Sequence, residues 1–417
     1  VLVSCGHYYE AGIAMKSGVT LKSATGDPSC ATIDPYFAAR AIVCSGVDST
    51  ATIEGFTIQN GYTDVNGGGI YCYDSFLTIS SCRFTGNQAV GGGAMRCDQS
   101  SPLIEDCAFE FNNASGNGAA LSCYESSPTI DNCTFFYNMT GVKGGAIACY
   151  AGSEPEITHS VFQNNEARDA GAVYCYYSDV EMTDCAAYGN SAYSSGGAVG
   201  TVGCSPSFTR CTIVGNSARP DSGGGFAFHS STPTLDNTIV AFSTGGGAVT
   251  CEAGGTPVLS CCDIFGNTGG DWTGCIASQE GLSGNISRDP LFFDPLSDDY
   301  RLTACSPCLS PPGCGRIGMY GLARQPITVR VPDDEETIAD GLNAAAPCDT
   351  VLVEAGTYYE HDLTLRAGDR LVSETGEANC VTIDAESGGR VFHVSGADST
   401  TVLRGFTIQN GYHIERG

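Results

Sequence analysis

Residues 67–87 read GGGIYCYDSFLTISSCRFTGN, and variants of this stretch recur along most of the first 267 residues. The stretch has a glycine turn, an apolar run around Ile70 and Cys72, a second run from Leu77 to Phe84, and a closing Asn87. It returns every 23–27 residues with similar residues in equivalent places. A fixed short period indicates a solenoid, because one unit cannot bury its own apolar face but a stack of units can.

Each repeat alternates apolar and polar residues over two or three short runs, separated by Gly, Asn and Ser. Alternation with a period of two is typical of β-strands, and no part of the repeat zone keeps helical spacing. The sequence therefore predicts an all-β parallel β-helix, in which each repeat is one coil and coils stack about 4.8 Å apart.

An asparagine closes most repeats. Stacked amides can hydrogen-bond along a stack of turns, and asparagine tolerates left-handed φ. The predicted asparagine ladder comprises Asn60, Asn87, Asn112, Asn138, Asn165, Asn190, Asn216 and Asn267.

The chain of 417 residues has 46 acidic and 19 basic residues, which gives a net charge of −27. This charge argues against nucleic acid and anionic membranes as partners. No apolar run approaches the roughly 20 residues of a membrane span, so we expect no membrane insertion within this chain.

The 23 cysteines indicate an oxidising compartment and disulfides. A repeat tends to have both of its two cysteines or neither of them, which predicts one disulfide within each coil. The alternative is two columns of buried free thiols, because cysteine also packs as a small apolar residue. The predicted bonds are Cys72–Cys82, Cys97–Cys107, Cys123–Cys133 and Cys175–Cys185.

Residues 351–412 repeat residues 1–62 at a constant offset of 350, from VLVEAGTYYE against VLVSCGHYYE to GFTIQNGY in both copies. Cys5 and Cys44 are both replaced in the second copy, which predicts a Cys5–Cys44 bond. Cys348 and Cys380 make a second plausible pair. We expect the chain to be a window on a longer chain or filament of head-to-tail units.

The predicted domains are a β-helix unit at 1–320, a linker at 321–332 and the start of a second unit at 333–417. The first unit ends in a Cys- and Pro-rich cap at 289–320. The segment 333–346, DDEETIADGLNAAA, predicts one short capping helix, with acidic residues in its first turn and two apolar residues four apart.

The FxxN and GGA-plus-aliphatic pairs, as in Phe84–Asn87 and Gly145–Ile147, resemble repeats of chlamydial polymorphic outer membrane proteins. More broadly the chain is similar to the pectin-lyase-like superfamily of secreted bacterial proteins. This resemblance implies right-handed coiling and export to the cell surface or medium. It implies little about activity, because the fold hosts lyases, hydrolases, adhesins and inert scaffolds.

No catalytic residue is predicted, and whether the chain is an enzyme stays open, with a non-enzyme favoured. The Gly-His-Gly and Arg-Ile-Lys signatures of related polygalacturonases are absent, and no lysine lies in an acidic cluster of the repeat zone. Outward acids occur at Asp131, Glu156 and Asp184, but we expect no second acid in register with them. His159 and His229 are likewise predicted to lack an acidic partner.

One metal site is predicted in the cap, where hard carboxylate oxygens suit Ca²⁺. The alternative is a solvated turn, and no other cofactor is expected. The candidate ligands are Asp289, Asp294, Asp298 and Asp299.

Tyrosines lie beside the first cysteine column, at alternate positions that point outward. A tyrosine strip on a flat sheet can bind glycan or another copy of the chain, although β-propensity alone also explains it. The strip comprises Tyr71, Tyr73, Tyr124, Tyr150, Tyr174, Tyr176 and Tyr177.

The leading hypothesis is an exported structural or surface protein of tandem β-helix units, such as a fibre, stalk or adhesin, which contacts further copies of itself. The alternative is an extracellular protein that binds or degrades a polysaccharide. A third hypothesis is a depolymerase similar to phage tail spikes.

Overall fold

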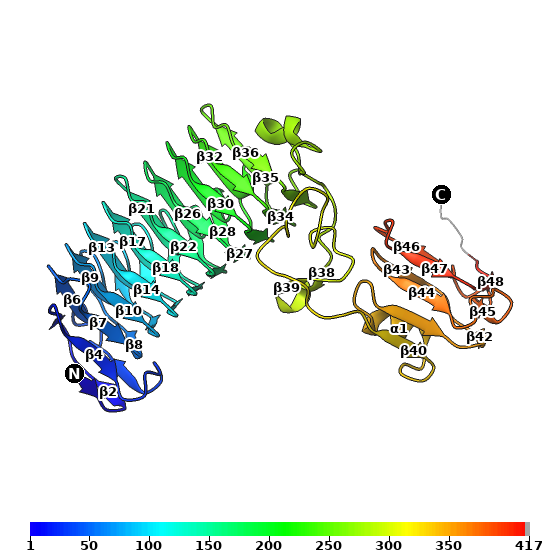
Figure 1. Cartoon of the computed structure of the whole chain (residues 1–417), viewed down its shortest axis with the longest axis horizontal. Helices are drawn as coiled ribbons and strands as arrows, with labels where there is room; N and C mark the ends of the chain where they lie inside the picture. Colours follow the sequence, from blue (N-terminus) through cyan, green and yellow to red (C-terminus); the bar gives the residue numbers. More distant parts are fainter. Residues whose placement is uncertain (413–417) are drawn as a thin grey trace. The chain divides into compact units, whose positions relative to one another are not determined.

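The computed structural model describes residues 1–412, and residues 413–417, the end of the predicted second unit, lie outside the described residues. The chain divides into two compact units. The first contains residues 1–288 and 312–319, and the second contains residues 289–311 and the chain from residue 320 onward. The ribbon of each unit is a stack of short strands (Figure 1).

The first unit is a parallel β-solenoid with three long sheets and one short sheet, and all strand pairs within these sheets are parallel. Sheet A consists of β1 (Leu2–Val3), β4 (Thr20–Ser23), β7 (Thr52–Glu54), β10 (Thr78–Ser80), β14 (Leu103–Glu105), β18 (Thr129–Asp131), β22 (Glu156–Thr158), β26 (Glu181–Thr183), β30 (Ser207–Thr209), β33 (Thr234–Asp236) and β36 (Val258–Ser260). Sheet B consists of β2 (Gly6–Tyr8), β5 (Ala31–Ile33), β8 (Phe56–Gln59), β11 (Arg83–Thr85), β15 (Ala108–Glu110), β19 (Thr134–Phe136), β23 (Val161–Gln163), β27 (Ala186–Tyr188), β31 (Thr212–Val214), β34 (Ile239–Ala241) and β37 (Asp263–Phe265). Sheet C consists of β3 (Ile13–Ala14), β6 (Ile42–Ser45), β9 (Ile70–Tyr73), β13 (Met95–Asp98), β17 (Leu121–Tyr124), β21 (Ile147–Tyr150), β25 (Val173–Tyr176), β29 (Val199–Val202), β32 (Gly223–His229) and β35 (Gly247–Glu252). Sheet D consists of β12 (Gln88–Ala89), β16 (Asn113–Ala114), β20 (Met139–Thr140), β24 (Glu166–Asp169) and β28 (Ser191–Ser195).

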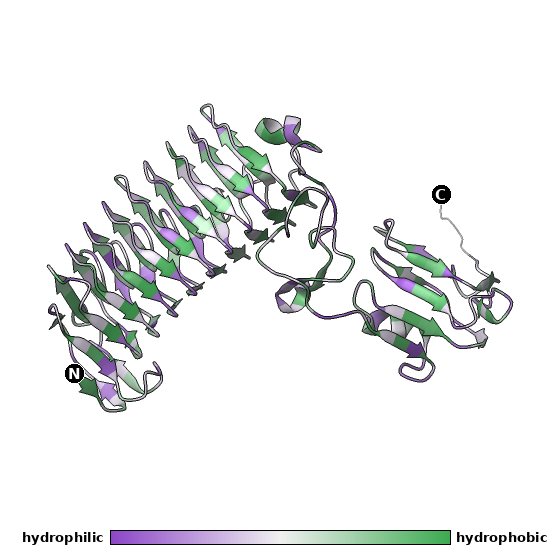
Figure 2. Ribbon diagram, in the orientation of Figure 1, coloured by the Kyte–Doolittle hydropathy of each residue, from purple (hydrophilic) through white to green (hydrophobic). Residues whose placement is uncertain are grey.

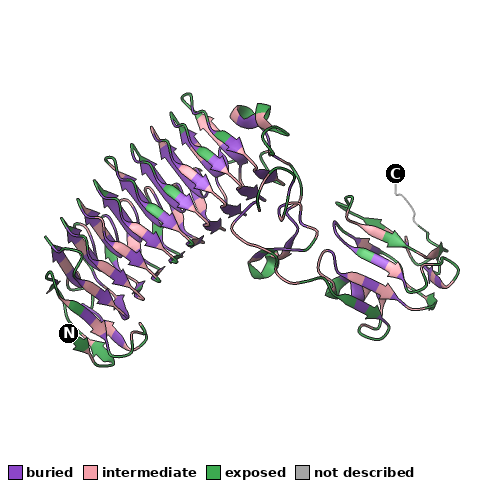
Figure 3. Ribbon diagram, in the orientation of Figure 1, coloured by how far each residue is buried: buried purple, intermediate pink, exposed green. Residues whose placement is uncertain are grey.

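The register of the strands places like residues on like residues, as the repeat predicts. Phe84, Phe109, Phe135 and Phe162 stack with ring centroids 4.7–4.9 Å apart and with nearly parallel planes. Apolar residues alternate with polar ones along the strands (Figure 2), and buried positions alternate with accessible ones in the same rhythm (Figure 3). The hydrophobic core is therefore a set of columns that run along the stack.

The asparagine ladder is confirmed from Asn87 to Asn216, where each Nδ2 donates to the next Oδ1 at 2.9–3.0 Å. Asn267 occupies the same column and accepts a hydrogen bond from the backbone of Ser243. Asn60 is not a member, because Gly61 takes this position and donates its N–H to Asn87. The Asn60 side chain donates instead to Asp34.

The second unit repeats the start of the first. One of its sheets contains β40 (Thr328–Val331), β41 (Thr350–Val353), β44 (Arg370–Ser373) and β47 (Val402–Arg404). The others contain β42 (Gly356–Tyr358), β45 (Val381–Asp384) and β48 (Thr407–Gln409), and β43 (Leu363–Leu365) with β46 (Phe392–Val394). Asp384 accepts hydrogen bonds from Gln409 and Asn410, as Asp34 does from Gln59 and Asn60. The 350-residue offset thus holds at the level of side-chain contacts.

The capping helix is confirmed, but α1 covers only Ile338–Ala344, because Thr337 is its N-cap and accepts from the backbone of Asp340. Ile338 and Leu342 are buried in the core of the second unit. The acidic residues at 333–336 precede the helix. Strand β40 also lies within the segment predicted as a linker.

The Cys- and Pro-rich cap is divided between the units. Residues 312–319 pack on the first unit, where Gly318 donates to the carbonyl of Asn237. The end of the first core is covered by a different segment, in which Trp272 and Ile276 are buried around the 3₁₀ helix η1 (Gly274–Gln279). The antiparallel strands β38 (Phe292–Asp294) and β39 (Asp299–Leu302), with the 3₁₀ helix η2 (Pro295–Ser297) between them, belong to the second unit.

Candidate functional site

The disulfides predicted within coils are wrong. Cys72 lies in β9 of sheet C and Cys82 follows β10 of sheet A, and both are buried free thiols. Two residues that are about ten apart in one coil belong to different sheets, because a turn separates them. Two residues that are one whole coil apart belong to the same sheet. The alternative of two buried thiol columns is therefore observed. The other pairs that remain unbonded are Cys97–Cys107, Cys123–Cys133 and Cys175–Cys185.

The disulfides that form join Cys5–Cys30, Cys251–Cys275, Cys261–Cys314 and Cys305–Cys348. The predicted Cys5–Cys44 and Cys348–Cys380 bonds are consequently wrong. Cys5 lies beside Cys30 of the next coil, with 4.4 Å between their Cα atoms, while Cys44 is buried in the core under sheet C. Cys380 is a half-buried free thiol.

The predicted Ca²⁺ ligands do not converge. Asp299 is paired with Arg301, Asp289 accepts from the backbone of Leu291, and Asp298 accepts from the Tyr300 hydroxyl. Asp294 precedes η2 as its N-cap. Among residues 1–412, no group of three or more His, Cys, Asp or Glu side chains is arranged to hold a metal.

Two of the outward acids have basic partners, contrary to the expectation from the sequence. His159 Nδ1 lies 2.8 Å from Asp131 Oδ1, and its Nε2 lies 4.0 Å from Asp184 Oδ2. Arg210 donates two hydrogen bonds to Asp184, which lowers the pKa of that carboxyl. The hydroxyl of Thr158 and then His159 lower the pKa of Asp131. Glu156 lies exposed on β22 in register with Glu181 of β26, and Asp131 is in register with Glu105 of β14, so the expectation of no second acid in register is wrong for both.

The tyrosine strip follows two outward columns of sheet C. Tyr71 and Tyr174 belong to one column, and the other contains Tyr73, Tyr124, Tyr150 and Tyr176. Tyr177 follows β25 and packs edge-on against Tyr176. Exposure differs widely, because Tyr73 is 45% exposed whereas Tyr174 is only 4% exposed.

Cations lie over this strip at three places. Arg40 lies 4.8 Å from the ring centroid of Tyr71, Arg96 lies 5.7 Å from that of Tyr124, and Lys143 lies 4.4 Å from that of Tyr174. A cation over an aromatic face is attracted by the negative charge of the ring face. A band of basic and aromatic groups therefore runs along sheet C of a strongly acidic chain.

A groove with a volume of about 240 Å³ interrupts the strip beside Tyr174. The outward column continues past Tyr174 with Gly200 and Ala227, whose small side chains leave a hollow above the sheet. The groove is lined by Lys143, Asp169, Tyr174, Tyr176, Ser195, Thr201, Val202, Ala227, Phe228, His229 and Glu252.

Lys143 and His229 are the groove's basic side chains. The Nζ of Lys143 donates to the hydroxyl of Tyr174 at 2.7 Å, and no ion pair of Lys143 is found within residues 1–412. Burial raises the pKa of Tyr174. His229 Nδ1 lies 3.4 Å from Glu252, so the predicted isolation of His229 is also wrong. The groove thus combines the Lys143 ammonium, the face of Tyr176, hydrogen-bonding groups, and two carboxylates, Asp169 and Glu252, which are paired with Arg168 and His229.

The tyrosines of this groove are predicted from the sequence and His229 only as an isolated histidine, whereas Lys143, Glu252, Asp169 and Ser195 are not predicted to belong to a site. These residues come from five successive coils, and only the register brings them together. The repeat could have shown that three of them are neighbours, since Lys143, Asp169 and Ser195 follow one another at intervals of 26 residues, about one coil.

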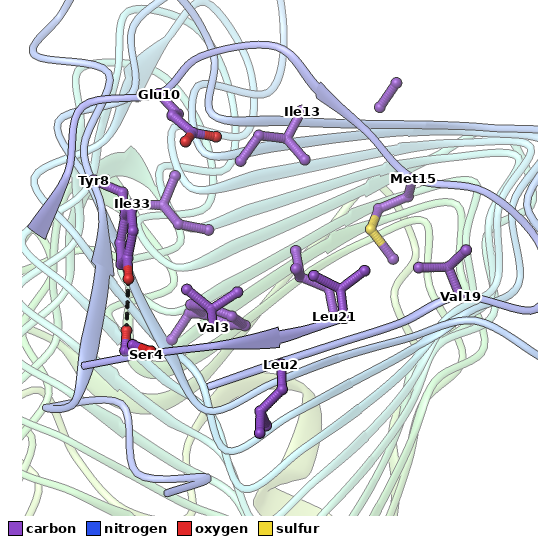
Figure 4. A pocket seen from close by; sticks show the side chains of 13 residues that line it. Leu2, Val3, Ser4, Tyr8, Glu10, Ile13, Met15, Val19, Leu21 and Ile33 are labelled. Atoms are coloured by element: carbon purple, nitrogen blue, oxygen red, sulfur yellow. Dashed lines mark hydrogen bonds between the residues drawn. The ribbon is translucent and has the colours of Figure 1, made fainter. Parts of the chain in front are cut away.

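A second hollow, of about 570 Å³, lies at the end of the first unit that contains residue 1 (Figure 4). Its walls are core side chains such as Val3, Ile13 and Leu21, and the Tyr8 hydroxyl donates to the carbonyl of Ser4 beside them. The hollow is the open end of the apolar columns, and we assign no ligand to it.

Among comparisons with known proteins, one family model agrees with this architecture. Residues 36–175 match the family model described as a right-handed beta helix region. No curated protein sequence matches the chain. Among solved structures, the chain is similar to the PL6 family alginate lyase AlyGC and to an arginine-to-alanine mutant of it. Each match has 10% identity and covers 96% of this chain and 69% of that chain, with TM-scores of 0.37 and 0.30. No activity is assigned from similarity of this size.

No helix within residues 1–412 has the length and apolar character that crossing a membrane requires. The parallel sheets extend the matched pattern on both sides of residues 36–175. The chain is a right-handed parallel β-helix protein.

Proposed function

We propose that this β-helix protein binds an acidic polysaccharide outside the cell, along the outer face of sheet C. The observation that carries the proposal is Lys143, an ammonium without an ion-pair partner in the described chain, held over two tyrosine rings at a groove. A carboxylate-bearing sugar would pair with Lys143 while its ring packs on Tyr176. Arg40 extends the same chemistry along the strip, whereas Arg96 is ion-paired with Asp98.

The disulfides support the location outside the cell, and the net charge limits where on the chain an acidic ligand can bind. The four disulfides are typical of proteins in oxidising compartments. The net charge of −27 opposes polyanions in general, so an acidic ligand requires a local cationic band such as this one.

Binding is tested by calorimetry with alginate and polygalacturonate, and with dextran as the neutral polymer. We expect the acidic polymers to bind, more weakly as salt rises. Lys143→Met should weaken binding roughly 10- to 150-fold, since a charge-assisted hydrogen bond contributes about 1.5–3 kcal/mol. Lys16→Met, which removes an exposed lysine of the first coil, is the control.

Tyr176→Ala should also weaken binding, whereas Tyr193→Ala, at an exposed tyrosine of sheet D, should not. Equal binding of acidic and neutral polymers, or equal effects of the two lysine variants, would contradict the proposal.

Cleavage of the bound polymer is a second candidate, favoured by the 2.7 Å contact between Lys143 and Tyr174. β-Elimination needs a base for the proton beside the uronate carboxylate and an acid for the leaving oxygen. Burial keeps the Tyr174 phenol protonated, which suits proton donation rather than removal. The appearance of unsaturated sugar ends, followed by ultraviolet absorbance, separates cleavage from binding alone.

A structural function, with contacts between copies of the chain, remains the other proposal. The repetition of the first unit's opening strands in the second unit supports it. An assembly that forms equally well with the Lys143→Met variant and without polysaccharide would favour this proposal.

A further inference from the structure

Six cysteines form one continuous column in the core under sheet C. Each is the third residue of its strand, each is fully buried, and successive members are in register. The column ends where Thr201 and then Phe228 take the equivalent position. Its members are Cys44, Cys72, Cys97, Cys123, Cys149 and Cys175.

The spacing of this column suits covalent bonds along the stack. Neighbouring parallel strands lie about 4.8 Å apart, and a disulfide accepts Cα separations of about 4.4–6.8 Å. Cys5 and Cys30, which occupy equivalent places in neighbouring coils, are already bonded with a Cα separation of 4.4 Å. A bond between directly neighbouring coils is therefore compatible with this fold.

A second column of thiols, under the turn between sheets A and B, has a different role. The Sγ of Cys107 donates to the carbonyl of Glu105 at 3.2 Å and accepts the N–H of Cys82 at 3.4 Å. Ser160 replaces a thiol in this column and makes the same two contacts with its hydroxyl. These thiols therefore act as hydrogen-bond donors, and oxidation would remove that function.

The column under sheet C makes no such bonds. Its sulfurs interact with one another, as Cys72 does with Cys44 and Cys97, and within residues 1–412 none donates to a backbone carbonyl. Oxidation of this column therefore breaks no hydrogen bond to the backbone.

We propose that the column under sheet C oxidises to three axial disulfides, Cys44–Cys72, Cys97–Cys123 and Cys149–Cys175, while the second column stays reduced. When six thiols lie in a row, only one set of pairs between neighbours includes all six. This set of bonds would join coils two by two along the stack.

The oxidant is a small or protein disulfide. One cysteine thiolate attacks the oxidant and releases one thiol, and the neighbouring thiolate then displaces the second thiol from the mixed disulfide. Two cysteine thiols and one oxidant disulfide thus give one cystine and two oxidant thiols. Because the folded column is fully buried, the reaction takes place while the coils are stacking.

The test is disulfide mapping of the full chain after refolding with reduced and oxidised glutathione. The sample is quenched in acid, alkylated in denaturant, digested without reduction and analysed by mass spectrometry. We expect cross-linked peptides for the three axial pairs, and alkylated Cys82, Cys107, Cys133, Cys185 and Cys211. Alkylation of all six column cysteines overturns the proposal, as does equal oxidation of the second column.

Matched variants test the pairing. Cys97→Ser should leave Cys123 as an alkylated thiol and keep the other two bonds, whereas Cys107→Ser should change no bond. A wild-type peptide that joins Cys123 to Cys149 contradicts the assigned pairs. If either variant fails to fold, the disulfide map of the wild-type protein alone still tests the assigned pairs.

Discussion

The Nδ2 of Asn112 donates a hydrogen bond to Oδ1 of Asn138 at 3.0 Å, and both amides are buried in the core of the first unit. Asn112 also donates to the carbonyl of Phe84 in the preceding coil, and its backbone N–H donates to Asn138. Each ladder amide thus joins buried groups of the coils on both sides of it. The ladder fixes the register because a shift by one residue would leave several such groups unpaired.

Asn138→Ala should therefore be strongly destabilising. It removes the partner of Asn112, of Asn165 and of the carbonyl of Phe109. Since a buried unsatisfied polar group costs about 1–3 kcal/mol, we expect a loss of about 3 kcal/mol or more in the free energy of unfolding. Urea denaturation measures it, with the half-buried Asn113→Ala on the outer face of sheet D as the control, expected within about 0.5 kcal/mol. Equal losses in both variants would refute the ladder's role.

The phenylalanine column predicts a second contrast. Phe109→Ala opens a cavity between Phe84 and Phe135 and should cost about 3–5 kcal/mol in unfolding free energy. Phe111→Ala, two residues away on a side chain that is 54% exposed, should cost far less. Thermal denaturation of both variants tests this difference, which would be absent if the column were loosely packed.

Acid should weaken the first unit partly through Asp184. The hydrogen bonds from Arg210 lower the folded-state pKa of this carboxyl below its unfolded value of about 3.9. Its contribution is therefore fully present above pH ~4 and is lost as the pH falls through the folded pKa. Asp184→Asn should be less stable than wild type at neutral pH, and the difference should shrink in acid. Melting temperatures across this range decide it, with Asp74→Asn at an exposed turn as the control.

The pKa values of two tyrosines should be high. Burial raises the pKa of both Tyr150 and Tyr174 above the usual value of about 10. In the native protein at pH ~11, Tyr174→Phe should leave the phenolate absorbance unchanged, because Tyr174 is still protonated. In denaturant at the same pH, the variant should lose the absorbance of one phenolate. A loss in the native protein would show that Tyr174 titrates normally.

The sequence was sufficient to predict the coils, the stacking, the asparagine ladder and the second unit, because each follows from residues one period apart. The pairing of the cysteines was not predictable in the same way. Cys72 and Cys82 are close in sequence and change together among repeats, yet they lie under different sheets. Correlated occurrence within a coil reports a shared packing environment as readily as a bond.

The groove was only partly predictable. The tyrosines were found because they repeat, whereas Lys143 and His229 each occur once in their columns. Their proximity depends on the small residues Gly200 and Ala227 between them, which carry no signal of their own. A chemical site on a solenoid is therefore defined by departures from the repeat, which an analysis of periodicity averages out.

The parallel stacking has a mechanical consequence. Hydrogen bonds between the strands point along the stack, so a tensile load on the two ends of the first unit opens one rung at a time instead of shearing all rungs together. Each opened coil of 23–27 residues releases roughly 80 Å of chain. Under tension the unit should therefore lengthen in many small steps of similar size at modest force. A disulfide between two neighbouring coils would keep the chain between its two cysteines, about one coil, from extending.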